Sequence, residues 1–221
     1  TLERIKNLIF DYLMISTNQK YLSHVRFHLK KNNIRKYKIV LEPAKKNTAP
    51  AILASSLIKD IPNEQPIIFF PADHLIEKTS AFNKSINKNK KNLNNRNIFI
   101  FGIKPTNPSS EYGYFLSKKI NKNIIKVTKF IEKPNKHKAK QIIKKKGYWN
   151  SGIFFLRKDS IIYNFKKNQP KTYKSCLDSV NKAKLKNKTY YLNKTSFIKS
   201  FEKSFDYAIL EKTKEINAIK L

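Results

Sequence analysis

Residues 37–58 read YKIVLEPAKKNTAPAILASSLI, and this stretch indicates the fold class. The apolar run Tyr37-Lys-Ile-Val-Leu41 predicts a strand, and residues 48–58 predict a helix that Asn47 or Thr48 caps. A strand that leads through a short polar loop into a helix is the unit from which α/β folds are built.

The same alternation continues along the chain, where apolar runs predict strands and helical spacing or capping residues predict helices. The predicted strands are residues 12–16, 66–70, 97–103, 124–132 and 149–156, and the predicted helices are residues 19–31, residues 137–146, a helix from Asp159 onward and residues 204–213. Residues 83–96 are interpreted as a solvated helix end or loop, and residues 166–196 are weakly patterned. The alternation predicts an α/β sandwich with a mostly parallel sheet.

Length and composition limit the class of protein. A chain of 221 residues with 40% hydrophobic residues is long enough for one domain with a sizeable core. A single cysteine excludes an internal disulfide and favours a reducing compartment, which we take to be the cytoplasm. No uncharged apolar run approaches the length of a membrane span, so no membrane partner is expected.

The net charge of +32 suggests a polyanionic partner. However, 42 of the 47 basic residues are lysines and they are spread along the whole chain, whereas nucleic-acid surfaces favour arginine. We therefore interpret the charge as a solvated lysine-rich surface and expect no specific nucleic-acid partner. Such a surface still favours small polyanionic substrates.

Two predicted strands are followed closely by an acidic residue, at the strand end where α/β sheets bind ligands. Glu42 precedes a helix N-terminus, which offers N–H groups to an anion, and its carboxylate suits the hydrogen-bond donors of guanine. Asp73 follows the strand 66–70, where a carboxylate suits Mg²⁺ held against substrate phosphates. Taken alone, the first segment also fits ordinary helix capping, and Asp73 also fits a turn after Pro71.

Three later segments carry polar groups suited to a sugar phosphate. Gly113 lies between two tyrosines and permits close backbone approach. Glu132 suits sugar hydroxyls and Lys133 suits a phosphate, but neighbouring strand residues reach one ligand only where the strand ends or bends, which Pro134 favours. Asn150 carries a donor and an acceptor for hydroxyls. Each segment also fits a bland alternative, namely a tight turn, a solvated ion pair or a strand start.

The order and spacing of these segments are more informative than any one of them. The succession E-P-x-x-x-N-T-A-P-A, P-A-D-H, F-G-I-x-P-T-x-P, Y-G-Y, F-x-E-K-P, W-N-S-G and D-Y-A-x-x-E-K-T resembles the mannose-1-phosphate guanylyltransferases of the sugar nucleotidylyltransferase family. The resemblance covers nearly the whole chain. It implies one nucleotidyltransferase domain over residues 1–221, with a Rossmann-like three-layer sandwich and a mixed, mostly parallel sheet.

The resemblance also implies a reaction and its residues. GMP would pass from GTP to mannose 1-phosphate, giving GDP-mannose and pyrophosphate, with Mg²⁺ as cofactor. Asp73 would hold the metal and act in catalysis together with Lys133, which would touch the sugar phosphate. The nucleotide would contact Glu42, Asn47 and Thr48, and the sugar would contact Gly113, Glu132, Asn150 and Asp206.

The family's glycine-rich loop would precede Thr1, and its second metal-binding aspartate would follow Leu221. We therefore expect an incomplete domain, truncated at both ends, whose own turnover stays open. One alternative is a catalytically inactive remnant or regulatory subunit that binds a sugar nucleotide. Another is a basic nucleic-acid-binding protein, and a homo-oligomer is also left open.

Overall fold

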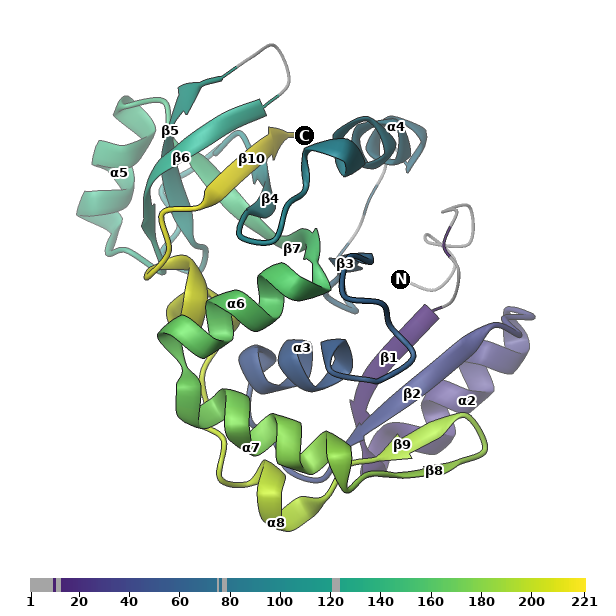
Figure 1. The fold of residues 1–221 in the computed structure, drawn as a ribbon. Helices are drawn as coiled ribbons and strands as arrows, with labels where there is room; N and C mark the ends of the chain where they lie inside the picture. Colours follow the sequence, from purple (N-terminus) through teal and green to yellow (C-terminus); the bar gives the residue numbers. More distant parts are fainter. Residues whose placement is uncertain (1–9, 11–12, 75, 77–78, 121–123) are drawn as a thin grey trace.

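The computed structural model describes residues 10, 13–74, 76, 79–120 and 124–221, which form two β-sheets with helices on both faces (Figure 1). Tyr12, the start of the first predicted strand, lies outside the described residues. The rest of that strand is confirmed from Leu13 onward.

The strands lie in two sheets, one with the order β1-β2-β9-β8 and one with the order β3-β7-β4-β10-β6-β5. β7 also pairs with β5. The described strands are β1 (Leu13–Asn18), β2 (Tyr37–Glu42), β3 (Pro66–Phe69), β4 (Ile98–Ile103), β5 (Tyr114–Lys119), β6 (Ile124–Ile131), β7 (Tyr148–Arg157), β8 (Lys184–Lys186), β9 (Thr189–Tyr191) and β10 (Ile216–Lys220).

Helices connect most of these strands, as the predicted alternation requires. The described helical segments are η1 (Gln19–Tyr21), α2 (Leu22–Lys31), α3 (Thr48–Ser56), α4 (Thr79–Asn89), η2 (Lys90–Asn92), α5 (Lys136–Lys144), α6 (Lys158–Asn168), α7 (Pro170–Asn181), α8 (Lys194–Phe197) and η3 (Asp206–Leu210). The weakly patterned stretch 166–196 thus contains α7, the hairpin β8–β9 and α8. The predicted helix 204–213 is mainly the π-helical turn η3.

Alternate residues of a strand face different helical layers. In β2, Ile39 and Leu41 pack with Leu22 and Leu29 of α2, while Val40 joins the main core with residues of α3 and α7. This alternation follows from the two-residue period of a strand and gives a helix layer on each face of the sheet. β4 shows the same alternation, because its odd- and even-numbered apolar residues belong to different core clusters. The expected three-layer α/β sandwich is confirmed.

The sheets are mixed, as the fold class predicted. β1–β2, β2–β9 and β4–β10 pair in parallel, and the other pairs are antiparallel. Antiparallel pairs therefore outnumber parallel pairs, whereas the sequence predicted a mostly parallel sheet. The main reason is that β7 lies between β3 and β4 and runs opposite to both.

Two further features bear on the predictions from composition. Among the described residues, no helix combines the length and apolar character that a membrane crossing requires. Cys176 is fully buried, and burial raises the pKa of its thiol to about 12. A thiol that stays protonated is a poor nucleophile, so Cys176 acts as a packing residue.

Phe205 anchors the segment that leads from α8 to β10. The side chain has no exposed surface, and its ring centroid lies 4.7 Å from that of Phe154 and 6.1 Å from that of Phe165. The aromatic contacts join this segment to β7 and α6. Close aromatic packing at these distances adds to the free energy gained by burial alone.

Phe205→Ala should therefore lower the free energy of unfolding by about 3–5 kcal/mol, because it removes a large side chain from a closed core. Urea unfolding followed by the fluorescence of Trp149 measures this change. Phe201→Ala is the matched control, since Phe201 is 50% exposed and its loss should change stability by roughly 0.5 kcal/mol or less. Equal effects of the two substitutions would contradict the anchoring role.

Candidate active site

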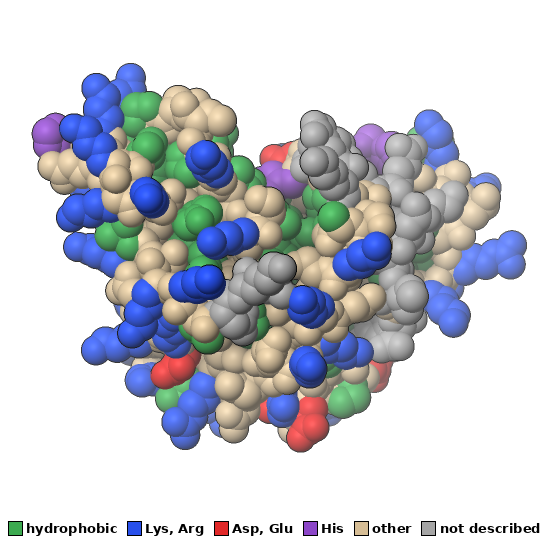
Figure 2. All heavy atoms as spheres, turned by 90° about the horizontal axis from the view of Figure 1, so that it is seen from above, with side chains coloured by type: hydrophobic (Ala, Val, Ile, Leu, Met, Phe, Trp, Pro, Cys, Tyr) green, Lys and Arg blue, Asp and Glu red, His purple; other side chains and the backbone are tan. Residues whose placement is uncertain are grey.

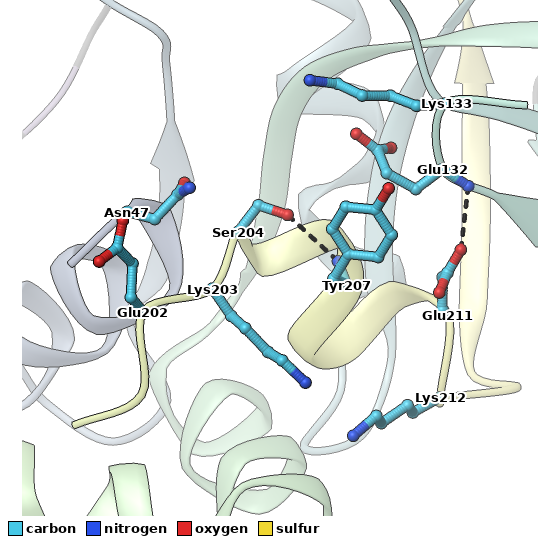
Figure 3. A pocket seen from close by; sticks show the side chains of 9 residues that line it. All are labelled: Asn47, Glu132, Lys133, Glu202, Lys203, Ser204, Tyr207, Glu211 and Lys212. Carbon is cyan, nitrogen blue, oxygen red and sulfur yellow. Dashed lines mark hydrogen bonds between the residues drawn. The ribbon is translucent and has the colours of Figure 1, made fainter.

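A pocket of about 430 Å³ opens between three segments that lie far apart in the sequence (Figure 3). These are the start of α3, the end of β6 and the segment from Glu202 to Lys212 that contains η3. The pocket is lined by Asn47, Glu132, Lys133, Glu202, Lys203, Ser204, Tyr207, Glu211 and Lys212. Every lining residue carries a polar or charged group, and the charged groups include both carboxylates and ammonium groups.

The end of β6 turns so that two neighbouring residues line the same pocket. The strand ends at Ile131, and Lys133 has a φ of +45°, in the left-handed region. The backbone N–H of Glu132 donates to Oε1 of Glu211 at 3.0 Å. Figure 3 shows the side chains of Glu132 and Lys133 extending to the same side of this turn. The bend that the sequence required for a shared ligand is therefore present.

Gly113 makes room for the Glu132 carboxylate. A Cβ at position 113 would collide with Oε2 of Glu132 and would lie 3.2 Å from the ring of Phe130. Oε2 is itself buried, and none of the described residues donates a hydrogen bond to it. The group that lies against the backbone of Gly113 is thus the carboxylate of Glu132. An unpartnered buried carboxylate oxygen is unfavourable unless a ligand donates to it.

Asn150 is held on two sides beside this carboxylate. Its Nδ2 donates to Oδ1 of Asp206 at 2.8 Å, and its Oδ1 accepts from the backbone N–H of Gly152 at 3.3 Å. The backbone N–H of Asn150 donates to the backbone oxygen of Gly113 at 2.8 Å. Asn150 of β7 and Asp206 of η3 are therefore brought together, with Asp206 fixing the orientation of the amide.

The two neighbouring carboxyl groups titrate near neutrality. Burial raises the pKa of Glu132 to about 7, and the negative charge of Asp206 adds to this rise, while Lys133 opposes it. Burial also raises the pKa of Asp206 to about 6, against the opposing effects of hydrogen bonds and of Lys133. Glu132 lines the pocket together with Lys133, and Asp206 lies behind this lining. A perturbed carboxyl group beside a lysine in a pocket is typical of functional sites.

The start of α3 is tied to the segment that carries η3. Asn47 has a φ of +64° and caps α3 by accepting from the N–H of Thr48 at 2.8 Å. Oγ1 of Thr48 accepts from the N–H of Phe205 at 2.9 Å, and the oxygen of Lys203 accepts from the N–H of Ala49 at 3.0 Å. Helix capping is therefore present, and two of the first N–H groups of α3 already have protein partners.

Glu42 lies at the end of β2, next to the end of β1. Its Oε1 accepts from Oγ of Ser16 at 2.7 Å, and its backbone oxygen accepts from Nδ2 of Asn18 at 3.3 Å. Burial raises the pKa of Glu42, and the hydrogen bond from Ser16 opposes this rise. Glu42 does not line the pocket of Figure 3, whereas Asn47, five residues later, does.

Asp73 follows β3 and is exposed. Its loop lies against β7, since Pro71 and His74 would each lie 3.5 Å from a Cβ placed on Gly152. Among the residues that the structure describes, no group of three or more His, Cys, Asp or Glu side chains is arranged to hold a metal ion. One exposed carboxylate fits Mg²⁺ when substrate phosphates and water supply the other ligands.

None of the residues of the segment 202–212 that line the pocket, Glu211 among them, was predicted from the sequence, and the predicted Asp206 does not line it. The signal was present in the motif D-Y-A-x-x-E-K-T, in which only Asp206 was assigned a role. The backbone N–H of Glu211 donates to the backbone oxygen of Asp206, five residues back, at 3.0 Å. This hydrogen bond closes the π-helical turn. Such turns are rare and occur often at functional sites.

The basic residues do not form one patch on the face shown in Figure 2. Lys and Arg side chains are distributed over this face between hydrophobic and neutral groups, with few acidic side chains among them. This agrees with a lysine-rich surface in which only some lysines, such as Lys133, have a defined place in a pocket.

Comparison with known proteins agrees with this geometry. Residues 1–197 match a family model described as "Nucleotidyl transferase". A protein of Escherichia coli named mannose-1-phosphate guanylyltransferase is 31% identical over 224 residues, which are 97% of this chain and 48% of that protein. The alginate biosynthesis protein AlgA of Pseudomonas fluorescens is 27% identical over 226 residues, which are 100% of this chain and 47% of that protein. The chain spans about half the length of the curated relatives it matches.

A solved structure is similar along the whole chain. The crystal structure of mannose-6-phosphate isomerase from Helicobacter pylori has a TM-score of 0.89 at 28% identity and is covered to 87%, with 100% of this chain aligned. The family model and the 31% identical relative confirm, at the level of the family, the resemblance found in the sequence.

The raised pKa of Glu132 predicts how stability changes with pH. The ordinary pKa of a glutamate is 4.5, and that of folded Glu132 is about 7, so the folded state keeps a proton that the unfolded chain has lost. The contribution of Glu132 to the free energy of unfolding should therefore fall as pH rises from about 4.5 to about 7 and be constant above. Glu132→Gln removes this titration.

Urea unfolding at several pH values tests this. The stability of Glu132→Gln relative to the wild type should rise between about pH 5 and pH 8. The control is Glu215→Gln, because Glu215 is an exposed partner of Lys126 and should show no such rise. Parallel pH curves for Glu132→Gln and the wild type would exclude a raised pKa at this position.

Proposed function

The chain belongs to the nucleotidyl transferase family, and from this premise we propose that it acts as a mannose-1-phosphate guanylyltransferase. In the proposed reaction, a phosphate oxygen of mannose 1-phosphate attacks the α-phosphorus of GTP. A P–O bond forms between the two substrates, the bond from the α-phosphorus to the oxygen bridging to the β-phosphate breaks, and pyrophosphate leaves. The other product is GDP-mannose.

The turn at the end of β6 is the observation that carries this proposal. It directs a carboxylate and an ammonium group from neighbouring residues, Glu132 and Lys133, into one pocket. Lys133 would hold the sugar phosphate by charge, and Oε2 of Glu132 would accept a hydrogen bond from a sugar hydroxyl. A hydroxyl would supply the hydrogen bond that this buried oxygen lacks among the described residues.

The neighbouring residues would complete the sugar site. Asn150 would offer its second Nδ2 hydrogen to the sugar, because Asp206 accepts the first. Asp206 would contribute to sugar binding indirectly, by holding the side-chain amide of Asn150 in place. Gly113 would act by leaving room for the Glu132 carboxylate.

The guanine end of GTP is assigned to the region around the start of α3. The Glu42 carboxylate, which Ser16 holds at one oxygen, would accept hydrogen bonds from the N1–H and N2–H groups of guanine. Asn47 would contact the nucleotide from the pocket wall, and the hydroxyl of Thr48, which accepts from Phe205, would donate to it. Selection of GTP over ATP would then rest on the carboxylate of Glu42.

Mg²⁺ is proposed as the cofactor, with Asp73 as the side chain that would hold it beside the nucleotide phosphates. Bound there, the ion would neutralise phosphate charge and polarise the α-phosphoryl group. The residues of the chain itself would bind and align the two substrates, and such alignment of nucleophile and leaving group lowers the barrier for phosphoryl transfer.

Isothermal titration calorimetry with mannose 1-phosphate and with GDP-mannose tests the proposal. Lys133→Met should weaken the binding of both ligands by about tenfold or more, since it removes a charge-assisted hydrogen bond to phosphate. Lys136→Met is the matched control, because it removes an exposed lysine three residues later that does not line the pocket. Removal of Mg²⁺ with EDTA should weaken GDP-mannose binding.

Two results would count against this function. One is the absence of binding of either ligand by the wild-type chain in the presence of Mg²⁺. The other is an equal loss of affinity in Lys133→Met and Lys136→Met, which would mean that overall charge, rather than the turn, attracts the ligand.

A further inference from the structure

The backbone after β6 adopts a conformation that needs support. β6 pairs with β5 as far as Ile131, opposite Tyr114, so the N–H of Glu132 lies beyond this ladder. The φ of +45° at Lys133 is one that L-residues rarely adopt, because it brings the Cβ close to the following carbonyl oxygen. Backbone strain of this kind persists only where the surroundings hold it in place.

Glu211 supplies such a support from another part of the chain. Its Oε1 accepts from the N–H of Glu132 at 3.0 Å, across 79 residues of sequence. The position of Glu211 is itself set by the π-helical turn η3, because its backbone N–H donates to the backbone oxygen of Asp206. The acceptor therefore comes from a segment that the buried side chain of Phe205 anchors.

We propose that Glu211 is a positioning residue, which holds the turn after β6 so that Glu132 and Lys133 face the same sugar phosphate. The identity of this ligand rests on the proposed function, whereas the dependence of the turn on Glu211 does not. Without the acceptor, the N–H of Glu132 loses its partner and the left-handed conformation of Lys133 loses its support.

Electrostatics indicates that Glu211 acts through the backbone rather than by attracting the ligand. It places a third carboxylate near Glu132 and Asp206, and its charge raises the pKa of both groups. A carboxylate in this position also repels a phosphate. Its favourable contribution therefore lies in the hydrogen bond to Glu132, which an uncharged amide oxygen can also accept.

The test compares Glu211→Ala, Glu211→Gln and the control Glu215→Ala in the same 221-residue chain. Two quantities are measured, the hydrogen exchange rate of the Glu132 amide by NMR and the affinity for mannose 1-phosphate by calorimetry. Glu211→Ala should speed exchange of this amide about tenfold or more and weaken binding by a similar factor. Glu215→Ala should leave both within about twofold of the wild type. Glu211→Gln should keep the exchange rate within about twofold and should not weaken binding, since the amide oxygen accepts the same hydrogen bond and the repulsive charge is removed.

Each other outcome has a distinct meaning. Unchanged exchange in Glu211→Ala would overturn the proposal, and so would a loss of binding in Glu211→Gln as large as in Glu211→Ala, because the latter points to direct contact through charge. If the wild type binds no mannose 1-phosphate while exchange follows the predicted order, the proposed function fails and the role of Glu211 in the turn stands.

Discussion

Burial of Phe205 is the constraint on which the candidate site depends. The aromatic contacts of this side chain with Phe154 and Phe165 fix the segment between α8 and β10 against the core. The same segment supplies the acceptor Glu211 and also Asp206, and it closes over the start of α3 through Thr48. Three stretches that are distant in sequence therefore meet at one pocket because one apolar side chain is removed from water.

The chemistry of the pocket follows from a balance between burial and charge. Burial disfavours ionised Glu132, and the nearby carboxylates add to this effect, whereas Lys133 favours the ionised form. A ligand that carries both a phosphate and hydroxyl groups fits this balance, since the phosphate pairs with the ammonium group and a hydroxyl satisfies the buried oxygen. Gly113 and Asn150 contribute by shape and orientation rather than by charge.

The sequence predicts strands where apolar runs are short and uninterrupted, and it therefore predicts β2, β4 and β7 well. It misses α7, whose apolar residues have helical spacing but lie among lysines and other polar residues, and it misses β5, which turns from apolar to basic within six residues. Glu132 and Lys133 were found by residue type. Glu211 stands in the motif D-Y-A-x-x-E-K-T, but its role was not found, because the sequence does not show that it bonds to a residue 79 positions away. The split into two sheets has the same cause, since strand pairing is decided by tertiary contacts.

The most direct test of this account is a crystal structure of the chain with mannose 1-phosphate. We expect the phosphate within hydrogen-bond distance of Nζ of Lys133, a sugar hydroxyl that donates to Oε2 of Glu132, and an intact hydrogen bond from the N–H of Glu132 to Glu211. A sugar phosphate bound elsewhere on the chain, with Oε2 of Glu132 still lacking a donor, would contradict this account.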